Sequence, residues 1–172
     1  MRIWIVGPTG SGKTTLADQL GAALALPVIH LDDIHHLPGW QERSRIESCA
    51  ILRRNLRGQD WVVDGNYSWM RAEHHQSIDW ILWLDYGLCV TLPRLLRRTL
   101  RRARTGESVC NGNRESLERA FFNRESILWW ALSTHSTRRA GLTQELRSHS
   151  GVVRLRSSAE TQAWLRSFDR KP

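Results

Sequence analysis

One stretch near the N-terminus, Gly7-Pro8-Thr9-Gly10-Ser11-Gly12-Lys13-Thr14, constrains the fold of this chain more than any other feature. It matches the pattern G-x-x-x-x-G-K-[ST]. The short β-branched segment 2–6 precedes it, and the segment 15–24, with leucine and alanine at helical spacing, follows it. The pattern therefore stands between a predicted strand and a predicted helix, which is the context it requires.

This context predicts a cradle for a polyphosphate. Glycines let the backbone curl so that successive N–H groups point inward, and the start of the helix adds partial positive charge. We expect Lys13 to reach the β- and γ-phosphates and the Thr14 hydroxyl to bind Mg²⁺. The residues predicted to hold ATP are Gly7, Gly10, Ser11, Gly12, Lys13, Thr14 and Thr15. The alternative, a glycine-rich turn beside an unrelated lysine, is weak because the chain has only two lysines, Lys13 and Lys171.

Composition limits the class of protein. A chain of 172 residues is long enough for one α/β domain, and we expect a single domain over 1–172. The net charge of +8 comes almost wholly from arginine and indicates acidic partners, either nucleotides or nucleic acid. No segment approaches the about 18 apolar residues of a membrane span, and no leader pattern opens the chain, so we expect a cytoplasmic protein. We expect it to be a monomer or a homodimer. The three cysteines suggest neither a disulfide framework nor a zinc site.

Carboxylates follow two predicted strands. Asp32 and Asp33 end the strand predicted within 26–31, and ligands of open parallel sheets bind outside such strand ends. Asp32 is therefore a candidate to hold Mg²⁺ through water or to accept a proton from an attacking hydroxyl. Turn formation and helix capping are the alternative roles, and they apply more strongly to Asp33.

The second acidic strand end is Asp64-Gly65, after the buried strand predicted at 61–63. An aspartate there, downstream of a phosphate-binding loop, is a candidate Mg²⁺ ligand, with Gly65 allowing close approach of a substrate. Arg71 follows shortly after. It is either a bidentate clamp for a phosphate or a surface arginine, and the residues alone do not decide between these.

An arginine-rich segment follows the fourth predicted strand, 80–85. The predicted helix 88–104 has an apolar stripe and crowds six arginines into eleven residues, which repel one another unless an anion is present. A lid at about 102–125 that closes over ATP would bring the anion, and a helix that follows a nucleic-acid backbone is the competing interpretation. A solvated face accounts for some of these arginines.

The remaining elements follow from periodicity and punctuation. His35, His36 and the Pro38-Gly39 pair indicate a loop, with the histidines as loop or substrate contacts. We predict helices at 41–57, 114–133, 137–149 and 159–168, and a fifth strand at 152–155. The helix 114–133 places Arg124 within reach of the site.

These motifs together resemble the P-loop kinases related to adenylate kinase and, more closely, the bacterial DNA topology modulation proteins. The resemblance spans about residues 1–130. Besides the phosphate-binding loop it rests on Val28-Ile29-His30-Leu31-Asp32 followed by Pro38-Gly39-Trp40, on Trp61-Val62-Val63-Asp64-Gly65-Asn66-Tyr67, and on the arginines after the fourth strand.

The resemblance implies a fold and further roles. The fold is an α/β P-loop NTPase fold of three layers, with a five-stranded parallel sheet of order 2-3-1-4-5 and an arginine-rich lid. By resemblance, Arg71 holds an acceptor phosphate, although it lies a few residues later than in the kinase pattern. Arg97, Arg98, Arg101 and Arg124 match the lid arginines. An acid at Asp32 is more typical of kinases that phosphorylate hydroxyl groups.

The sequence therefore predicts an ATP- and Mg²⁺-dependent phosphotransferase acting on an unidentified small molecule. The predicted catalytic residues are Lys13, Asp32, Arg97, Arg101 and Arg124. The predicted metal ligands are Thr14 and Asp64, and the predicted acceptor contacts are Asp32, Asp33, Gly65 and Arg71. The alternative is an ATP-binding regulatory protein that binds nucleic acid through its arginine-rich helices.

Overall fold

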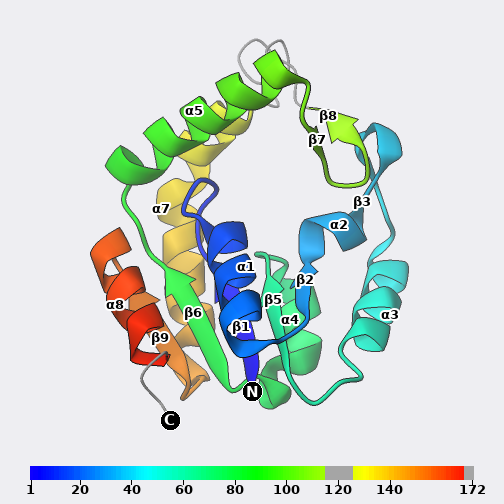
Figure 1. Cartoon of the computed structure of the whole chain (residues 1–172), viewed down its shortest axis with the longest axis vertical. Coiled ribbons are helices and arrows are strands. Elements are labelled where there is room, and N and C mark those ends of the chain that lie inside the picture. Colours follow the sequence, from blue (N-terminus) through cyan, green and yellow to red (C-terminus); the bar gives the residue numbers. More distant parts are fainter. Residues whose placement is uncertain (115–125, 169–172) are drawn as a thin grey trace.

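The computed structural model describes residues 1–114 and 126–168. Their core is a five-stranded parallel sheet in the order β2-β5-β1-β6-β9 (Figure 1). The strands are β1 (Arg2–Val6), β2 (Val28–His30), β5 (Trp61–Asp64), β6 (Trp80–Leu84) and β9 (Val152–Leu155). Counted along the chain this order is 2-3-1-4-5, so the predicted fold class is confirmed.

Helices cover both faces of the sheet. In β1, Ile3 and Ile5 point to one face and Trp4 and Val6 to the other, and all four are completely buried. Such strands are apolar on both sides because a parallel sheet is covered twice. The first face packs on α1 (Lys13–Leu24) and α8 (Ser158–Phe168), and the second on α3 (Arg45–Asn55), α4 (Ser68–His74) and the end of α7 (Ile127–Glu145).

The remaining elements lie beside the carboxyl ends of the strands. The long helix α5 (Leu88–Thr105) leaves β6 and arches over this end of the sheet, and a small hairpin brings the chain close to β3 (Figure 1). The hairpin consists of β7 (Ser108–Val109) and β8 (Asn113–Arg114). The other short elements are α2 (Leu31–His35), β3 (His36–Leu37), η1 (Pro38–Trp40), β4 (Gln41–Glu42), η2 (His75–Ser77) and η3 (Leu146–Ser148).

Two boundaries differ from the sequence prediction near the second strand. Asp32 and Asp33 lie in the first turn of α2 rather than in an open turn, where their charge suits the helix N-terminus. The helix predicted at 41–57 begins only at Arg45. Ser44 sets this start. The Ser44 hydroxyl accepts a hydrogen bond from the Glu47 N–H at 3.3 Å and donates one to the Glu47 carboxylate at 2.7 Å. Ser44 is therefore the N-cap of α3, and the Glu47 carboxylate accepts from the Ser44 hydroxyl.

The prediction of two separate helices at 114–133 and 137–149 was wrong. The described part is one helix, α7, which runs without a break across 134–136. Its hydroxyl side chains do not interrupt it, because Thr134 donates to the Trp130 carbonyl oxygen at 2.7 Å and so bonds back along the helix. Arg114, where a helix was expected to begin, is instead the last residue of β8, and the lid residues 115–125 lie outside the described residues.

Of the helices in residues 1–114 and 126–168, none combines the length and the apolar character needed to cross a membrane.

Two helical glycines give a matched test of this packing. A Cβ at Gly21 in α1 would lie 2.2 Å from Val28 Cγ2, whereas a Cβ at Gly141 in α7 would meet no heavy atom within 4 Å. We expect Gly21→Ala to lower the free energy of unfolding by about 1–3 kcal/mol through overpacking. Gly141→Ala should raise it by up to about 1 kcal/mol through helix propensity. Urea unfolding measures both, and equal effects of the two substitutions would contradict the packing of α1 on β2.

Candidate active site

A single large cleft of about 1490 Å³ opens at the carboxyl ends of the strands. It collects side chains from the loop after β1, from α2, from the end of β5 and from α5. Most of the residues singled out in the sequence line it: Gly10, Ser11, Gly12, Lys13, Thr14, Thr15, Asp32, Asp33, Asp64, Gly65, Arg97 and Arg101. Gly7 instead lines a small second cavity behind the loop.

The loop 7–14 has the strained backbone that its glycines permit. Gly12, directly before α1, has φ +93°, in the left-handed region that other residues rarely adopt. Gly10 approaches α5 so closely that a Cβ would lie 2.5 Å from the Thr91 carbonyl oxygen. The Lys13 ammonium donates to the Pro8 carbonyl oxygen at 3.2 Å, and burial lowers its pKa although Asp64 and Asp32 act in the opposite direction. The loop thus presents backbone N–H groups and one cation to the cleft.

Asn66 holds the start of this loop in place. Its amide group accepts a hydrogen bond from the Gly7 N–H at 3.0 Å and donates one to the Gly7 carbonyl oxygen at 2.7 Å. The side chain of a residue after β5 therefore makes a pair of hydrogen bonds with the backbone after β1, as a neighbouring strand would. These two hydrogen bonds fix the loop relative to Asp64, which lies two residues before Asn66.

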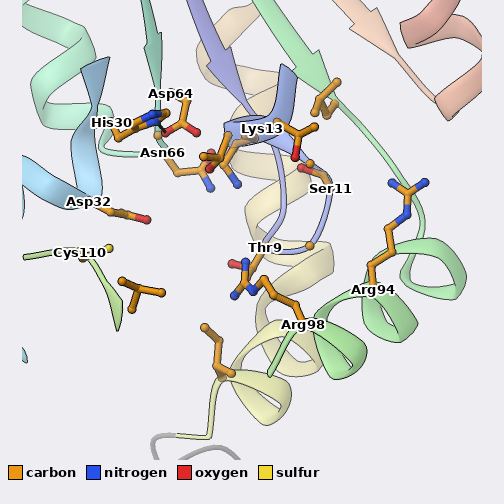
Figure 2. A pocket seen from close by; sticks show the side chains of 18 of the residues that line it. Thr9, Ser11, Lys13, His30, Asp32, Asp64, Asn66, Arg94, Arg98 and Cys110 are labelled. Atoms are coloured by element: carbon orange, nitrogen blue, oxygen red, sulfur yellow. Dashed lines mark ion pairs between the residues drawn. The ribbon is translucent and has the colours of Figure 1, made fainter. Parts of the chain in front are cut away.

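Asp64 is the buried carboxylate of the cleft. It is 4% exposed, and its Oδ2 has no hydrogen-bond partner among the residues that the structure describes. Its Oδ1 lies 3.5 Å from His30 Nδ1, because His30 and Asp64 are register partners at the ends of β2 and β5. The interaction with the Asp64 carboxylate is the main cause of a raised pKa of His30. Figure 2 shows the pair beside Lys13.

A buried carboxylate oxygen without a partner is costly unless a cation balances it. Asp64 and the Thr14 hydroxyl line the same cleft and offer the hard oxygen ligands that Mg²⁺ prefers. The donor set therefore fits the ion. Gly65 comes next with φ +144°, and a Cβ there would lie 2.8 Å from Leu31 Cβ, so the chain passes tightly beside α2.

Asp32 lies on the opposite side of the cleft from α5. Its Oδ1 accepts a hydrogen bond from the Tyr67 hydroxyl at 2.8 Å. Burial and the charge of Asp32 raise the pKa of Tyr67, so Tyr67 stays a donor at neutral pH. Figure 2 shows Asp32 and Cys110 on one side of the cavity and Arg98 and Arg94 on the other.

The arginines of α5 face the cleft from one side. Five of them line it: Arg94, Arg97, Arg98, Arg101 and Arg102. Glu107 pairs with Arg101 at 3.1 Å and with Arg102 at 3.6 Å. The buried side chains of α5 are Thr91, Leu95 and Thr99, and the loop 7–14 packs on this side of the helix, because a Cβ at Gly10 would lie 3.2 Å from Leu95 Cβ. The arginines lie beside this contact and line the cleft rather than facing only solvent.

Arg71 is placed differently from the sequence prediction. It is 1% exposed, does not line the cleft, and donates to Glu145 at the end of α7 at 2.7 Å. In this conformation a carboxylate 74 residues later in the chain holds the guanidinium, and the expected role of Arg71 beside an acceptor phosphate stays a prediction. Arg124, the other arginine predicted to act from beyond the lid, lies outside the described residues.

The hairpin β7–β8 is tied to the segment after β2. Asn111 donates to the carbonyl oxygens of Asp33 at 2.7 Å and His36 at 2.6 Å. Asn113 donates to the Leu37 carbonyl oxygen at 2.9 Å and accepts from the Trp40 N–H at 2.9 Å. These bonds bring the end of the arginine-rich segment onto the opposite wall of the cleft.

Sequence reasoning missed several residues of the cleft. Asn66 and Tyr67 were part of the quoted Asp-Gly-Asn-Tyr motif but received no role, although a polar side chain just after a strand end is the signal that applied to Asp64. His30 was assigned only to a strand. Arg138, from the middle of α7, also lines the cleft and packs over Trp130 at 4.5 Å. Nothing in its local sequence distinguishes it from the neighbouring Arg139.

The fold and the loop define a class: the described chain has the fold of the P-loop kinases. No protein-family model matches the sequence. The chain is similar to a shikimate kinase from Rhodopirellula baltica, with 27% identity over 108 residues, covering 54% of this chain and 58% of that protein. The match thus spans little more than half of the length of this curated relative.

Solved structures agree with the fold. A gluconokinase from Sinorhizobium meliloti matches with a TM-score of 0.55 and 19% identity, over 97% of this chain and 92% of that one. An uncharacterized protein from Eubacterium ventriosum matches with a TM-score of 0.53 and 12% identity, over 99% and 100%. At these identities the likeness shows the fold alone, and the activity of this chain has to be inferred from its own residues.

Two asparagines on opposite walls test the assignment of the loop. We expect Asn66→Ala to weaken binding of ATP by about 5- to 30-fold, because the backbone of Gly7 loses both partners and the cradle loosens. Isothermal titration calorimetry with ATP and Mg²⁺ measures this.

The matched control is Asn111→Ala, which also removes two side-chain hydrogen bonds but on the far wall. Its affinity for ATP should stay within about twofold of the unchanged protein. Equal losses in the two variants would show that Asn66 has no special relation to the nucleotide.

Proposed function

We propose that this protein is an ATP- and Mg²⁺-dependent phosphotransferase that phosphorylates a hydroxyl group of a small molecule. One observation carries the proposal: a single cleft holds the loop 7–14 with Lys13, the unpartnered carboxylate of Asp64, and the exposed carboxylate of Asp32. These are the parts needed to bind a triphosphate, a metal and an acceptor. Two similar proteins are kinases by name, which agrees with this reading.

The nucleotide is bound by the loop and the start of α1. Backbone N–H groups of residues 10–15 surround the phosphates, and Lys13 neutralises the β- and γ-phosphates. Asp64 and Thr14 would hold Mg²⁺, which would supply neutralisation of the phosphate charge when bound. His30 lies 3.5 Å from one oxygen of Asp64, and the other oxygen has no hydrogen-bond partner among the described residues.

The transfer step uses Asp32 and the arginines of α5. The acceptor hydroxyl oxygen forms a bond to the γ-phosphorus, and the bond from that phosphorus to the β–γ bridging oxygen breaks, which releases ADP. The hydroxyl proton passes to the Asp32 carboxylate, which Tyr67 orients by its hydrogen bond. Arg97 and Arg101, with Arg98 between them, stabilise the charge on the transferring group. Arg124 stays a prediction for the same role.

A closing lid is part of the proposal. In this conformation Arg101 and Arg102 pair with Glu107 rather than with a phosphate. We expect bound ATP to replace Glu107 as the partner of these arginines and to draw α5 and the lid 102–125 toward the loop 7–14. The lid is then part of a single domain. A polyphosphate in the cleft thus accounts for the arginines that line it without a nucleic-acid partner.

The two lysines of the chain give the most direct test. Lys13→Ala should lower the rate of phosphoryl transfer from ATP by at least about a thousandfold, because positioning and charge neutralisation of the phosphates supply most of the catalysis. The assay follows ADP formation with mixed alcohol, sugar, nucleoside and nucleotide acceptors. Lys171→Ala is the matched control and should retain full activity; equal losses would contradict the role of Lys13.

The metal assignment has its own matched pair, because two aspartates flank His30. We expect Asp64→Asn to raise the Mg²⁺ concentration for half-maximal activity by at least about tenfold. Asp18 also contacts His30, at 3.3 Å, but its side chain is 60% exposed and outside the cleft. Asp18→Asn should leave the Mg²⁺ dependence unchanged. An Mg²⁺ titration of activity in both variants decides the matter, and a normal midpoint in Asp64→Asn would remove Asp64 as a ligand.

A further inference from the structure

The cleft is strongly asymmetric in charge. Seven described cationic side chains line it, and all come from the loop 7–14, α5 and α7: Lys13, Arg94, Arg97, Arg98, Arg101, Arg102 and Arg138. The opposite half is formed by the segment from α2 to β4, the start of α4 and the hairpin. Among the described residues this half contributes the carboxylates Asp32, Asp33 and Glu42 and neither lysine nor arginine.

The arginines that lie near this half are engaged elsewhere. Arg43 donates from Nε to the Ile34 carbonyl oxygen at 2.9 Å, and Arg45 packs over the ring of Trp69 at 5.5 Å. Neither lines the cleft. Arg71, the expected anchor for an acidic acceptor, is paired with Glu145 in the core. Burial also lowers the pKa of His35, so this histidine stays uncharged at neutral pH.

Aromatic rings complete the same half. Trp40, Tyr67 and Trp69 line the cleft there, with centroids of Tyr67 and Trp69 at 5.9 Å and an edge-on arrangement. Faces of such rings attract cations, and carboxylates nearby strengthen the attraction. An anion would meet repulsion from three carboxylates and would find no described cation on this wall.

The acidic wall shares its cleft with a buried carboxylate, whereas its own carboxylates are exposed, the Glu42 side chain to 72%. The 4% exposed carboxylate of Asp64, with its unpartnered oxygen, lines the same cleft. Asp32 is oriented by Tyr67, and Asp33 and Glu42 appear in no ion pair with a lysine or arginine of the described chain. Two carboxylates therefore remain for binding after Asp32 has taken the reacting hydroxyl.

We propose that the acceptor is an amino alcohol, a compound that carries a hydroxyl and an ammonium group and no anionic group. The inference rests on the proposed function and names the class of its second substrate. Asp32 faces the hydroxyl, and Asp33, Glu42 and the ring of Trp40 receive the ammonium. The protein thereby differs in acceptor charge from enzymes that act on sugar acids or nucleoside monophosphates, whose anionic groups need a cation on this wall.

Three acceptor pools of different charge test the proposal with the full chain, ATP and Mg²⁺. The cationic pool contains amino sugars and amino alcohols, the neutral pool contains polyols, sugars and nucleosides, and the anionic pool contains sugar acids and nucleoside monophosphates. Lys13→Ala provides the blank. We expect Lys13-dependent ADP formation to be at least about tenfold faster with the cationic pool than with either other pool.

The outcomes separate the two claims. Fastest turnover with the anionic or the neutral pool overturns the inference and leaves the proposed function standing. Absence of Lys13-dependent turnover in all three pools contradicts the proposed function and, with it, the inference.

The acidic wall is then tested with the best cationic acceptor. Asp33→Asn and Glu42→Gln should each raise the KM for that acceptor by about two- to fivefold, with the KM for ATP unchanged. Glu73→Gln on α4 is the control, because Glu73 pairs with Arg53 outside the cleft. An unchanged acceptor KM in both wall variants would overturn the proposed ammonium site.

Discussion

The parallel register at the centre of the sheet is the constraint on which the site depends. Ile5 pairs with Asp64 and His30 pairs with the same Asp64, so three strands end at one level. The loop 7–14 leaves the middle strand there, and Asn66 bonds it to the end of β5. A buried carboxylate is thereby held next to a loop of backbone donors and a half-buried lysine. Without this alignment the same side chains would lie on separate parts of the surface.

Charge is distributed so that the two halves of the cleft have opposite character. Helix α5 and the loop supply positive charge where phosphates bind, and the segment after β2 supplies carboxylates and rings. A field that changes sign across one cleft directs two different ligands to their own sides. The hairpin bonds of Asn111 and Asn113 connect these halves, because they join the segment after α5 to the wall that contains Asp32.

The sequence predicts what depends on local pattern. The loop 7–14 and the aspartates after two strands follow from short motifs whose geometry is set by neighbouring residues, whereas the order of the strands is what the resemblance to the P-loop kinases related to adenylate kinase implies. Arg71 could not be placed in this way, because its position depends on Glu145, which reaches it only through the packing of α7 on α4. The expected break at 134–136 is absent from α7, where Thr134 bonds back to the Trp130 carbonyl oxygen. The role of Asn66 depends on which strand lies next to its own.

The central claim is that the loop, Asp64 and Asp32 form one phosphoryl-transfer site. A crystal structure of the complete chain with a non-hydrolysable ATP analogue and Mg²⁺ tests it most directly. The account predicts the γ-phosphate beside Lys13, Mg²⁺ bound by Thr14 with Asp64 as a direct or water-linked ligand, and Asp32 facing the terminal phosphate across an open acceptor space. A nucleotide bound with its phosphates away from Lys13, or Mg²⁺ held without Asp64, would contradict it.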